Sequence, residues 1–244
     1  MQPVKKVLMT REGRQYFVRD TSQDFHTQFG FVAKMDLKKR SGSVKSQTGK
    51  EFFIFDPSFI DSYRKIKRGP QIITLKDLGF IIAETGIGKE SKIVDAGAGS
   101  GASCCFLANI AKEVVSYENR KEFYEIATLN GESLGLKNLR VKYKDVYAGI
   151  SEKNVDLVLF DLPDPWKGVD VAAKALKPGG FLVSYSPTLA QVQDFVKAVQ
   201  DSGRFMYIKT AEINERTWEV EERKLRPKTA FLNHTGFMSV CRKA

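Results

Sequence analysis

Two aspartates and two prolines lie within residues 161–166, which read DLPDPW. The six residues before them, VDLVLF, are apolar apart from Asp156, as expected of a strand buried on both faces. Proline cannot donate to a sheet ladder, so the two prolines predict that strand pairing stops here. The corner would therefore hold Asp161 rigidly at a strand end, where a carboxylate can accept a hydrogen bond or stabilise a developing positive charge.

A glycine loop lies earlier in the chain, at residues 94–101, which read VDAGAGSG. Its glycines, Gly97, Gly99 and Gly101, would let the backbone turn sharply and approach a ligand closely. The spacing G-x-G-x-G differs from the G-x-G-x-x-G of dinucleotide enzymes. The carboxylate of Asp95 would repel a pyrophosphate but suits a cationic amino-acid group. A tight structural turn is the alternative interpretation.

Two further acids follow the next two predicted strands. Glu118 ends the strand 113–118, a position that suits an acceptor for both hydroxyls of a ribose. Asp145 follows the strand 139–143, where it would accept a hydrogen bond from the exocyclic amine of an adenine. The loop and the two acids together describe a site for S-adenosylmethionine. Ordinary charged strand ends are the alternative.

The elements that must position these residues alternate between strands and helices. This alternation predicts a doubly wound, Rossmann-like parallel sheet of the α/β class. The last two strands have no helical pattern between them, which predicts an antiparallel hairpin at the sheet edge. The seven predicted strands are 92–97, 113–118, 139–143, 155–161, 181–186, 205–213 and 236–243, and the helices between them are 100–111, about 123–134, 169–176 and 189–199.

The first third of the chain reads instead as a small β-rich domain, a sandwich or barrel. Strands are predicted at 5–10, 15–20 and 50–57, and a polar loop, KKRSGSVKSQTGK, at 38–50. We therefore expect two domains, a β-rich one at 1–62 and a catalytic one at 63–244.

The net charge of +10 is concentrated in the β-rich part. Residues 1–76 carry a balance of +9, and the remaining residues +1. Such clustering indicates a polyanion partner, with a solvated basic surface as the alternative. The best candidates for phosphate contacts are the consecutive cations Lys38, Lys39 and Arg40.

The sequence argues against a membrane protein, a secreted protein and a protein with a His-rich metal site. No apolar window is long enough to span a bilayer, and the N-terminus lacks a signal-peptide core, which predicts a cytoplasmic protein without membrane contact. Two histidines are too few for a His-rich metal site, so we expect no metal. The three cysteines (Cys104, Cys105 and Cys241) are expected to pack as small apolar residues.

The motifs VDAGAGSG, VVSYE, KDV and DLPDPW resemble those of class I S-adenosylmethionine-dependent methyltransferases. More narrowly, the chain resembles the tRNA (adenine-N1)-methyltransferases that act in the T-loop. Residues 40–58, 68–77 and 225–243 add to this resemblance, while residues 1–35 match it loosely. Where the family often has Tyr or His followed by Pro, this chain has Thr74 and Leu75.

The resemblance implies methylation of N1 of adenosine 58 in tRNA, with position 57 as a further candidate, by a homotetramer. Asp161 would be catalytic and would accept a hydrogen bond from the adenine N6 amine. The cofactor-binding residues would be Gln71, Asp95, Gly97, Gly99, Ser100, Gly101, Glu118, Asp145, Val146 and Asp161.

Three other functions remain open on the sequence. A non-catalytic tRNA-binding subunit would keep the fold and lose the cofactor motifs, which are intact here. A protein isoaspartyl methyltransferase would have no basic β domain and no DLPDPW. An adenine-N6 methyltransferase would carry a Pro-Pro pair at the corner, which Leu162 interrupts.

Overall fold

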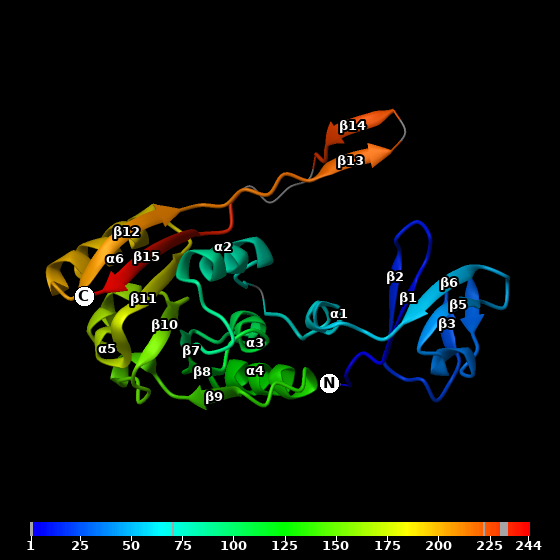
Figure 1. The fold of residues 1–244 in the computed structure, drawn as a ribbon, viewed down its shortest axis with the longest axis horizontal. Helices are drawn as coiled ribbons and strands as arrows, with labels where there is room; N and C mark the ends of the chain where they lie inside the picture. Colours follow the sequence, from blue (N-terminus) through cyan, green and yellow to red (C-terminus); the bar gives the residue numbers. More distant parts are fainter. Residues whose placement is uncertain (1, 70, 222, 230–233) are drawn as a thin grey trace. The chain divides into compact units, whose positions relative to one another are not determined.

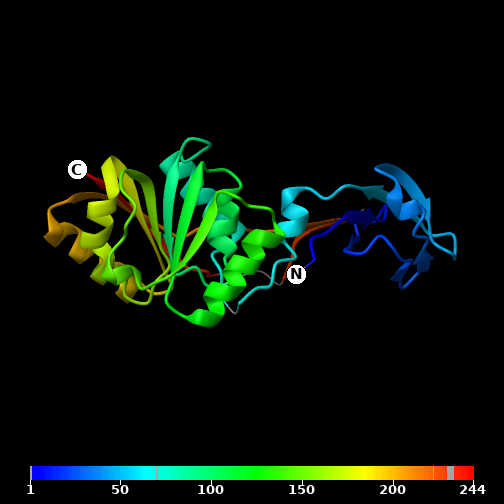
Figure 2. The same cartoon turned by 90° about the horizontal axis from the view of Figure 1, so that it is seen from below.

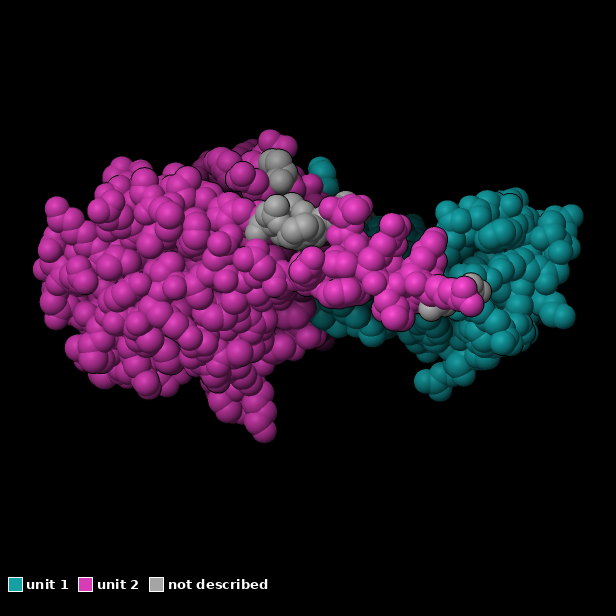
Figure 3. All heavy atoms as spheres, turned by 90° about the horizontal axis from the view of Figure 1, so that it is seen from above, with its two compact units in different colours: residues 1–67, 132–135 teal, residues 68–131, 136–244 magenta. Residues whose placement is uncertain are grey.

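The computed structural model describes residues 2–69, 71–221, 223–229 and 234–244. The chain forms two compact units, coloured separately in Figure 3. Unit 1 comprises residues 1–67 and 132–135, and unit 2 comprises residues 68–131 and 136–244.

Unit 1 is built on a four-stranded antiparallel sheet with the order β2-β1-β6-β5. Its core gathers buried apolar side chains, among them Leu8, Val18 and Phe52, with Tyr16 packed edge-on against Phe52. The strands are β1 (Lys6–Met9), β2 (Gln15–Val18), β5 (Ser41–Lys45) and β6 (Glu51–Phe55), accompanied by the hairpin β3 (Phe25–Thr27) and β4 (Gly30–Val32), the 3-10 turn η1 (Asp36–Lys38) and helix α1 (Phe59–Tyr63).

Strand β5 lies inside the segment 38–50, for which we predicted a loop, so that prediction was wrong. The strand pairs antiparallel with β6 from Ser41 opposite Phe55 to Lys45 opposite Glu51. It is an edge strand in which Val44 alone is buried. One apolar residue among polar ones leaves no alternating pattern for a sequence analysis to detect.

Unit 2 carries a seven-stranded sheet with the order β12-β15-β11-β10-β7-β8-β9. Figure 2 shows helices on both faces of this sheet, α5 and α6 on one side and α2, α3 and α4 on the other. The strands are β7 (Lys92–Ala96), β8 (Glu113–Glu118), β9 (Leu139–Tyr143), β10 (Val155–Phe160), β11 (Leu176–Ser186), β12 (Phe205–Ala211) and β15 (Phe237–Lys243); the helices are α2 (Leu75–Thr85), α3 (Ala102–Ala108), α4 (Lys121–Ser133), α5 (Val169–Ala175) and α6 (Leu189–Ser202), with short turns η2 (Val146–Ala148) and η3 (Pro165–Gly168).

The central strands are apolar because both of their faces are covered. Val94 and Ala96 of β7 and Phe160 of β10 face the α5–α6 side, where Phe195 and Val199 of α6 complete a core cluster. Phe160 and Phe195 have no exposed surface, and burying each contributes roughly 1.5–3 kcal/mol. This packing fixes the strands whose ends carry the predicted site.

The closing strands confirm the predicted antiparallel pair at the sheet edge. Strand β15 inserts between β11 and β12 and runs antiparallel to both, so β12 is the edge. The connection also contains a second hairpin, β13 (Trp218–Glu221) with β14 (Lys224–Pro227), which we did not predict (Figure 1). Its strands are short and carry alternating charges with few apolar residues, so the sequence pattern did not indicate strands there.

Within the described residues, no helix is both long and apolar enough to cross a membrane. Nor do the side chains of the described ranges include a cluster of three or more His, Cys, Asp or Glu suited to hold a metal ion. All three cysteines are buried and unpaired in disulfides.

Candidate cofactor and catalytic site

The site lies where the order of the sheet reverses. Strands β7 and β10 are parallel neighbours, yet the chain proceeds from β7 to β8 on one side and from β10 to β11 on the other. The loops that follow β7 and β10 therefore lead away in opposite directions from the carboxyl ends of these strands. This leaves a crevice between the two loops. Ligands of open α/β sheets bind in such crevices.

The glycine loop and the DLPDPW corner touch at this point. The amide of Asp161 donates to the carbonyl of Ala96 at 2.9 Å and so prolongs the pairing of the two strands. Gly97 follows with φ of +87°, and a Cβ placed on it would lie 2.0 Å from the carbonyl oxygen of Asp161. Only glycine fits, because both the backbone angle and the space exclude a side chain.

Glu118 is held at the end of β8 by backbone donors. Its Oε2 accepts from the amide of Gly99 at 2.9 Å, and its Oε1 accepts from the amide of Arg120 at 2.9 Å. The side chain is almost entirely buried, but the residue borders the crevice. Its Oε1 also accepts from Nε of Arg120 at 3.3 Å. A carboxylate accepts about four hydrogen bonds, so one position remains free for a ribose hydroxyl, and a second opens if the exposed Arg120 side chain gives up its bond.

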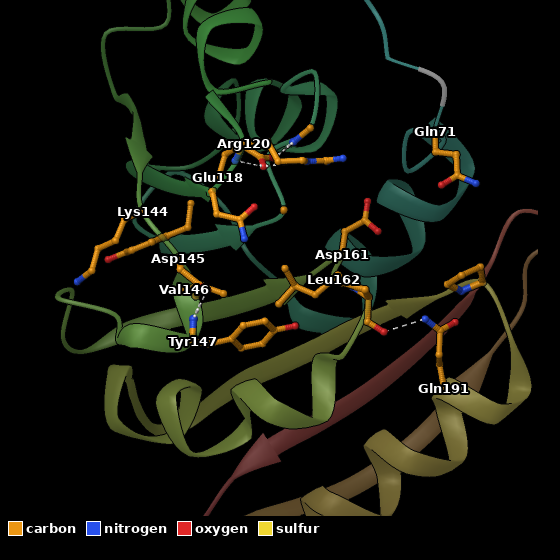
Figure 4. Close-up of a pocket in the computed structure, with 16 residues that line it drawn as sticks. Gln71, Glu118, Arg120, Lys144, Asp145, Val146, Tyr147, Asp161, Leu162 and Gln191 are labelled. Carbon is orange, nitrogen blue, oxygen red and sulfur yellow. Dashed lines mark hydrogen bonds and ion pairs between the residues drawn. The ribbon is translucent and has the colours of Figure 1, made fainter. Parts of the chain in front are cut away.

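A pocket of about 520 Å³ opens over these strand ends. Figure 4 shows Glu118 and Asp145 on one side of it, with Asp161 and Gln191 on the other. Seven predicted site residues line it: Gln71, Gly97, Gly99, Glu118, Asp145, Val146 and Asp161. The remaining lining residues were not predicted: Tyr117, Asn119, Arg120, Lys144, Tyr147, Leu162, Pro163, Pro187 and Gln191.

Three predicted cofactor residues are not part of the pocket lining. Asp95 is fully buried and accepts hydrogen bonds from the hydroxyls of Ser103 (2.8 Å) and Ser116 (2.5 Å). Gly101 is the N-cap residue directly before α3, and the hydroxyl of Ser100 is buried without a hydrogen-bond partner among the described residues. A direct cofactor contact of these three residues stays a prediction.

The pKa values of two carboxyl groups are raised. Burial raises the pKa of Asp95 to about 6, with a smaller contribution from the charge of Glu118, while hydrogen bonds from the two serines oppose the rise. Burial also raises the pKa of Asp161 to about 7, helped by the charges of Asp95 and Glu118 and opposed by Arg120. Perturbed carboxyl groups that face a crevice are typical of functional sites.

Asp161 differs from its neighbours in having no partner among the described residues. No described side chain or amide donates a hydrogen bond to its carboxylate, although its surroundings are largely dry. A half-buried carboxyl that borders a pocket and lacks such a partner is available to a bound molecule.

The residues present fit a cationic nucleoside ligand. At Gly99 a Cβ would have no neighbouring atom closer than 4.0 Å, so the glycine loop leaves open space there for a ligand. Glu118 faces the crevice as a hydroxyl acceptor, and the acids add negative charge opposite a cation. The fold and this site define an S-adenosylmethionine-dependent methyltransferase of the doubly wound class.

The family follows from comparison with known proteins. Residues 64–239 match the family model described as tRNA methyltransferase complex GCD14 subunit, and the chain belongs to this family.

Among its relatives is the tRNA (adenine(57)-N(1)/adenine(58)-N(1))-methyltransferase TrmI of Methanocaldococcus jannaschii, which is 34% identical over 97% of this chain and 94% of its own. The tRNA (adenine(58)-N(1))-methyltransferase TrmI of Thermus thermophilus is 30% identical, with 99% and 97% of the two chains covered.

Solved structures agree on the fold. A crystal structure described as an S-adenosylmethionine-dependent O-methyltransferase from Thermotoga maritima has a TM-score of 0.88 at 31% identity, covering 100% of this chain and 94% of that one. The tRNA (m1A58) methyltransferase TrmI from Aquifex aeolicus has a TM-score of 0.83 at 22% identity, with 100% and 98% covered, which supports the fold alone.

The structure shows which contacts are made by Thr74, by the DLPDPW corner and by the basic residues of unit 1. Thr74, which replaces the Tyr or His frequent in the family, precedes α2 and donates from its hydroxyl to Asp77 at 2.9 Å. At the DLPDPW corner, the carboxylate of Asp164 forms an ion pair with Lys167 at 2.7 Å. Lys38, Lys39 and Arg40 are exposed in unit 1, and Lys39 pairs with Asp36 at 2.8 Å.

Replacing Asp161 by Asn should lower turnover by about 10²–10³-fold, because one preorganised electrostatic partner is worth roughly that factor. Cofactor binding should be kept, since the amide has the same shape. In the unsubstituted protein, kcat/KM should rise with pH through about 7, because the acceptor form of Asp161 is its carboxylate. Single-turnover methylation from pH 5.5 to 9 measures both effects.

The matched control is Asp164→Asn, which removes a carboxylate from the same corner and should leave turnover within about twofold, as expected of an exposed ion pair. Equal losses in the two variants would contradict the role of Asp161.

Proposed function

We propose that this protein transfers a methyl group from S-adenosylmethionine to N1 of an adenosine in the tRNA T-loop, at position 58. The observation that carries the proposal is the unpartnered carboxylate of Asp161, which borders the same crevice as a ribose acceptor and a glycine loop. Membership of the GCD14 family and the names of the two TrmI relatives support tRNA as the substrate.

The cofactor, when bound, supplies an electrophilic methyl group on a sulfonium centre. The chain has to hold two reactants in line, since adenine N1 already carries a lone pair and needs no strong base. Most of the rate acceleration can then come from positioning. Glu118 would hold the ribose, and Asp145 and Val146 would flank the adenine of the cofactor. The glycine loop would let the backbone approach closely.

Asp161 has the chemistry required to position the target base. Its free carboxylate would accept a hydrogen bond from the N6 amine and so direct N1 into the pocket. Methylation places a positive charge on the base, and a carboxylate in dry surroundings stabilises it more strongly than water does. A base in a folded loop must be extruded to reach this pocket.

The product assay tests the function. The purified chain, incubated with labelled S-adenosylmethionine and an unmodified tRNA transcript, should yield 1-methyladenosine after digestion to nucleosides. The label should disappear when position 58 is changed to another base. A transcript changed at position 57 shows whether that site is also modified, as the name of the Methanocaldococcus relative indicates for that protein.

Cofactor binding without any methylated nucleoside would move the search to protein acceptors such as isoaspartyl residues. tRNA binding without cofactor binding would indicate a non-catalytic subunit.

We further propose that unit 1 contacts tRNA phosphates through Lys38, Lys39 and Arg40. These side chains are exposed. Lys38 ends the turn η1, which buried Leu37 anchors in the core of the unit, and Lys39 and Arg40 follow it. Their location in the part of the chain that carries most of the net charge adds support. A tRNA partner would also place the protein in the cytoplasm.

The double variant Lys38→Ala/Arg40→Ala should weaken tRNA binding and reduce the slope of log K against log salt by about 0.7–0.9 per lost phosphate contact. Cofactor affinity should be unchanged. The control Lys89→Ala/Lys137→Ala removes the same charge from exposed positions of unit 2. Identical salt slopes in the two double variants would count against these contacts.

We also propose that the protein is a homotetramer. The hairpin β13–β14 supports self-association, because Trp218, Val220 and Leu225 are all more than half exposed. Val220 pairs with Leu225 across the hairpin, so these side chains share a face. Sedimentation at assay concentrations should give the mass of four chains, and Val220→Lys/Leu225→Lys should lower it; a single-chain mass for the unsubstituted protein would contradict the proposal.

A further inference from the structure

His234 forms two hydrogen bonds where the chain returns to the sheet before β15. Its Nδ1 lies 2.6 Å from Oε1 of Glu212, the residue that follows β12. Its Nε2 lies 2.9 Å from the carbonyl oxygen of Pro187, the residue that follows β11. The ring also packs at 4.8 Å from that of Phe237. One side chain thus joins three segments that are far apart in the sequence.

Both partners of His234 are acceptors. An ionised carboxylate and a backbone carbonyl have no hydrogen to donate, so each ring nitrogen must supply one. A neutral imidazole carries a hydrogen on one nitrogen only. Both hydrogen bonds can therefore form together only when His234 is an imidazolium ion.

The charges around the ring favour that ion. The Glu212 carboxylate, and then the Pro187 carbonyl, raise the pKa of His234, against opposing effects of burial and of Lys76. From α2, Lys76 is itself paired with Asp77 at 2.7 Å, so that helix presents a compensated pair rather than a free cation. Because the pKa of His234 is raised in the folded protein, its bridge to Glu212 and Pro187 contributes its full stability at pH values below the ordinary pKa of histidine. Its contribution is lost as the pH rises through the folded value.

Pro187 connects this bridge to the pocket. It lines the pocket, and so does Gln191 in the first turn of α6. The side chain of Gln191 donates to the carbonyl of Pro163 at 3.0 Å, inside the DLPDPW corner (Figure 4). A continuous path of contacts therefore runs from His234 through Pro187 and the start of α6 to the corner that begins with Asp161.

The residues after His234 are anchored independently. Thr235 donates from its hydroxyl to Asp77 at 2.7 Å, and the same hydroxyl oxygen accepts from Nζ of Lys76 at 2.5 Å. Gly236 packs so closely on Tyr185 that a Cβ would lie 2.5 Å from the ring. Loss of the imidazolium would therefore release Pro187 without detaching the whole segment.

We propose that His234 is a positioning residue that acts as an imidazolium ion, fixing Pro187 and the start of α6 and so shaping the wall of the pocket that receives the target base. This inference rests on the proposed function for its kinetic consequences, but its structural part does not. It assigns to a histidine a role that transfers no proton to or from the substrate.

The protonation state is tested directly, because the chain has only two histidines. In ¹⁵N-labelled protein, the signals of His26 are identified by their loss in His26→Gln. At pH 7.5 both ring nitrogens of His234 should have shifts of protonated nitrogen. A neutral His234 ring at this pH would overturn the proposal, whether or not the protein methylates tRNA.

The positioning role is tested by kinetics. Glu212→Gln should move the loss of activity at high pH to a lower pH, because the carboxylate that raises the pKa of His234 is gone. His234→Ala should lower kcat/KM for tRNA about tenfold, the effect of one lost hydrogen bond to a charged group, with unchanged affinity for S-adenosylmethionine. His26→Gln serves as the control and should match the unsubstituted protein.

A merely structural histidine would change stability without moving the pH profile. Unchanged pH profiles in Glu212→Gln, together with unchanged kcat/KM in His234→Ala, would reject the positioning role. Absence of tRNA methylation in the unsubstituted protein would reject the proposed function instead and leave the ¹⁵N result standing.

Discussion

The close approach of β7 and β10 at their carboxyl ends is the constraint on which the rest of the site depends. The amide of Asp161 pairs with Ala96, and the next residue after β7, Gly97, has no space for a side chain beside the Asp161 carbonyl. This contact places a glycine loop and a catalytic candidate within one crevice. It also ends the pairing, because the prolines after Leu162 cannot continue the ladder.

The contact between the ends of β7 and β10 brings several negatively charged side chains close together. Asp95, Glu118 and Asp161 lie near enough for the charges of Asp95 and Glu118 both to raise the pKa of Asp161. Arg120 offsets part of this effect, with its Nε 3.3 Å from Glu118 and its guanidinium over the ring of Phe123. A cofactor that brings a sulfonium and an ammonium group would relieve the remaining repulsion, so the acids that repel one another favour a cationic ligand.

The strongly periodic parts of the fold could be predicted from the sequence. Strands such as β8 and β10 are mostly apolar runs, and the acids at the ends of such strands mark the site directly, which is why Glu118, Asp145 and Asp161 were identified as candidates. Edge strand β5 and the hairpin β13–β14 carry too few buried residues to produce a pattern. Strand lengths and types likewise contain no information on where β15 would insert.

Pocket residues such as Tyr147 and Gln191 were missed for a related reason. Each is an ordinary polar or aromatic residue at the start of a turn or helix, and nothing in its neighbours indicates that it faces a ligand. Conversely, Asp95 carries a strong sequence signal as part of the glycine motif, yet its carboxylate turns to Ser103 and Ser116 on the α3 side of the sheet. Strand position specifies which end of the sheet a residue occupies, while the direction of its side chain depends on pleat and packing.

The insertion of β15 explains why a segment so far along the chain reaches the site. Because β15 is antiparallel to β11, its first residue, Phe237, pairs with Ser186, the last residue of β11. The residues that lead into β15 therefore arrive at the carboxyl end of the parallel strands, where Pro187 borders the pocket. A parallel last strand would have begun at the opposite end of the sheet, and His234 would then have had no access to the pocket wall. The antiparallel strand thus adds a second group of side chains to a site otherwise built from the loops of the parallel strands.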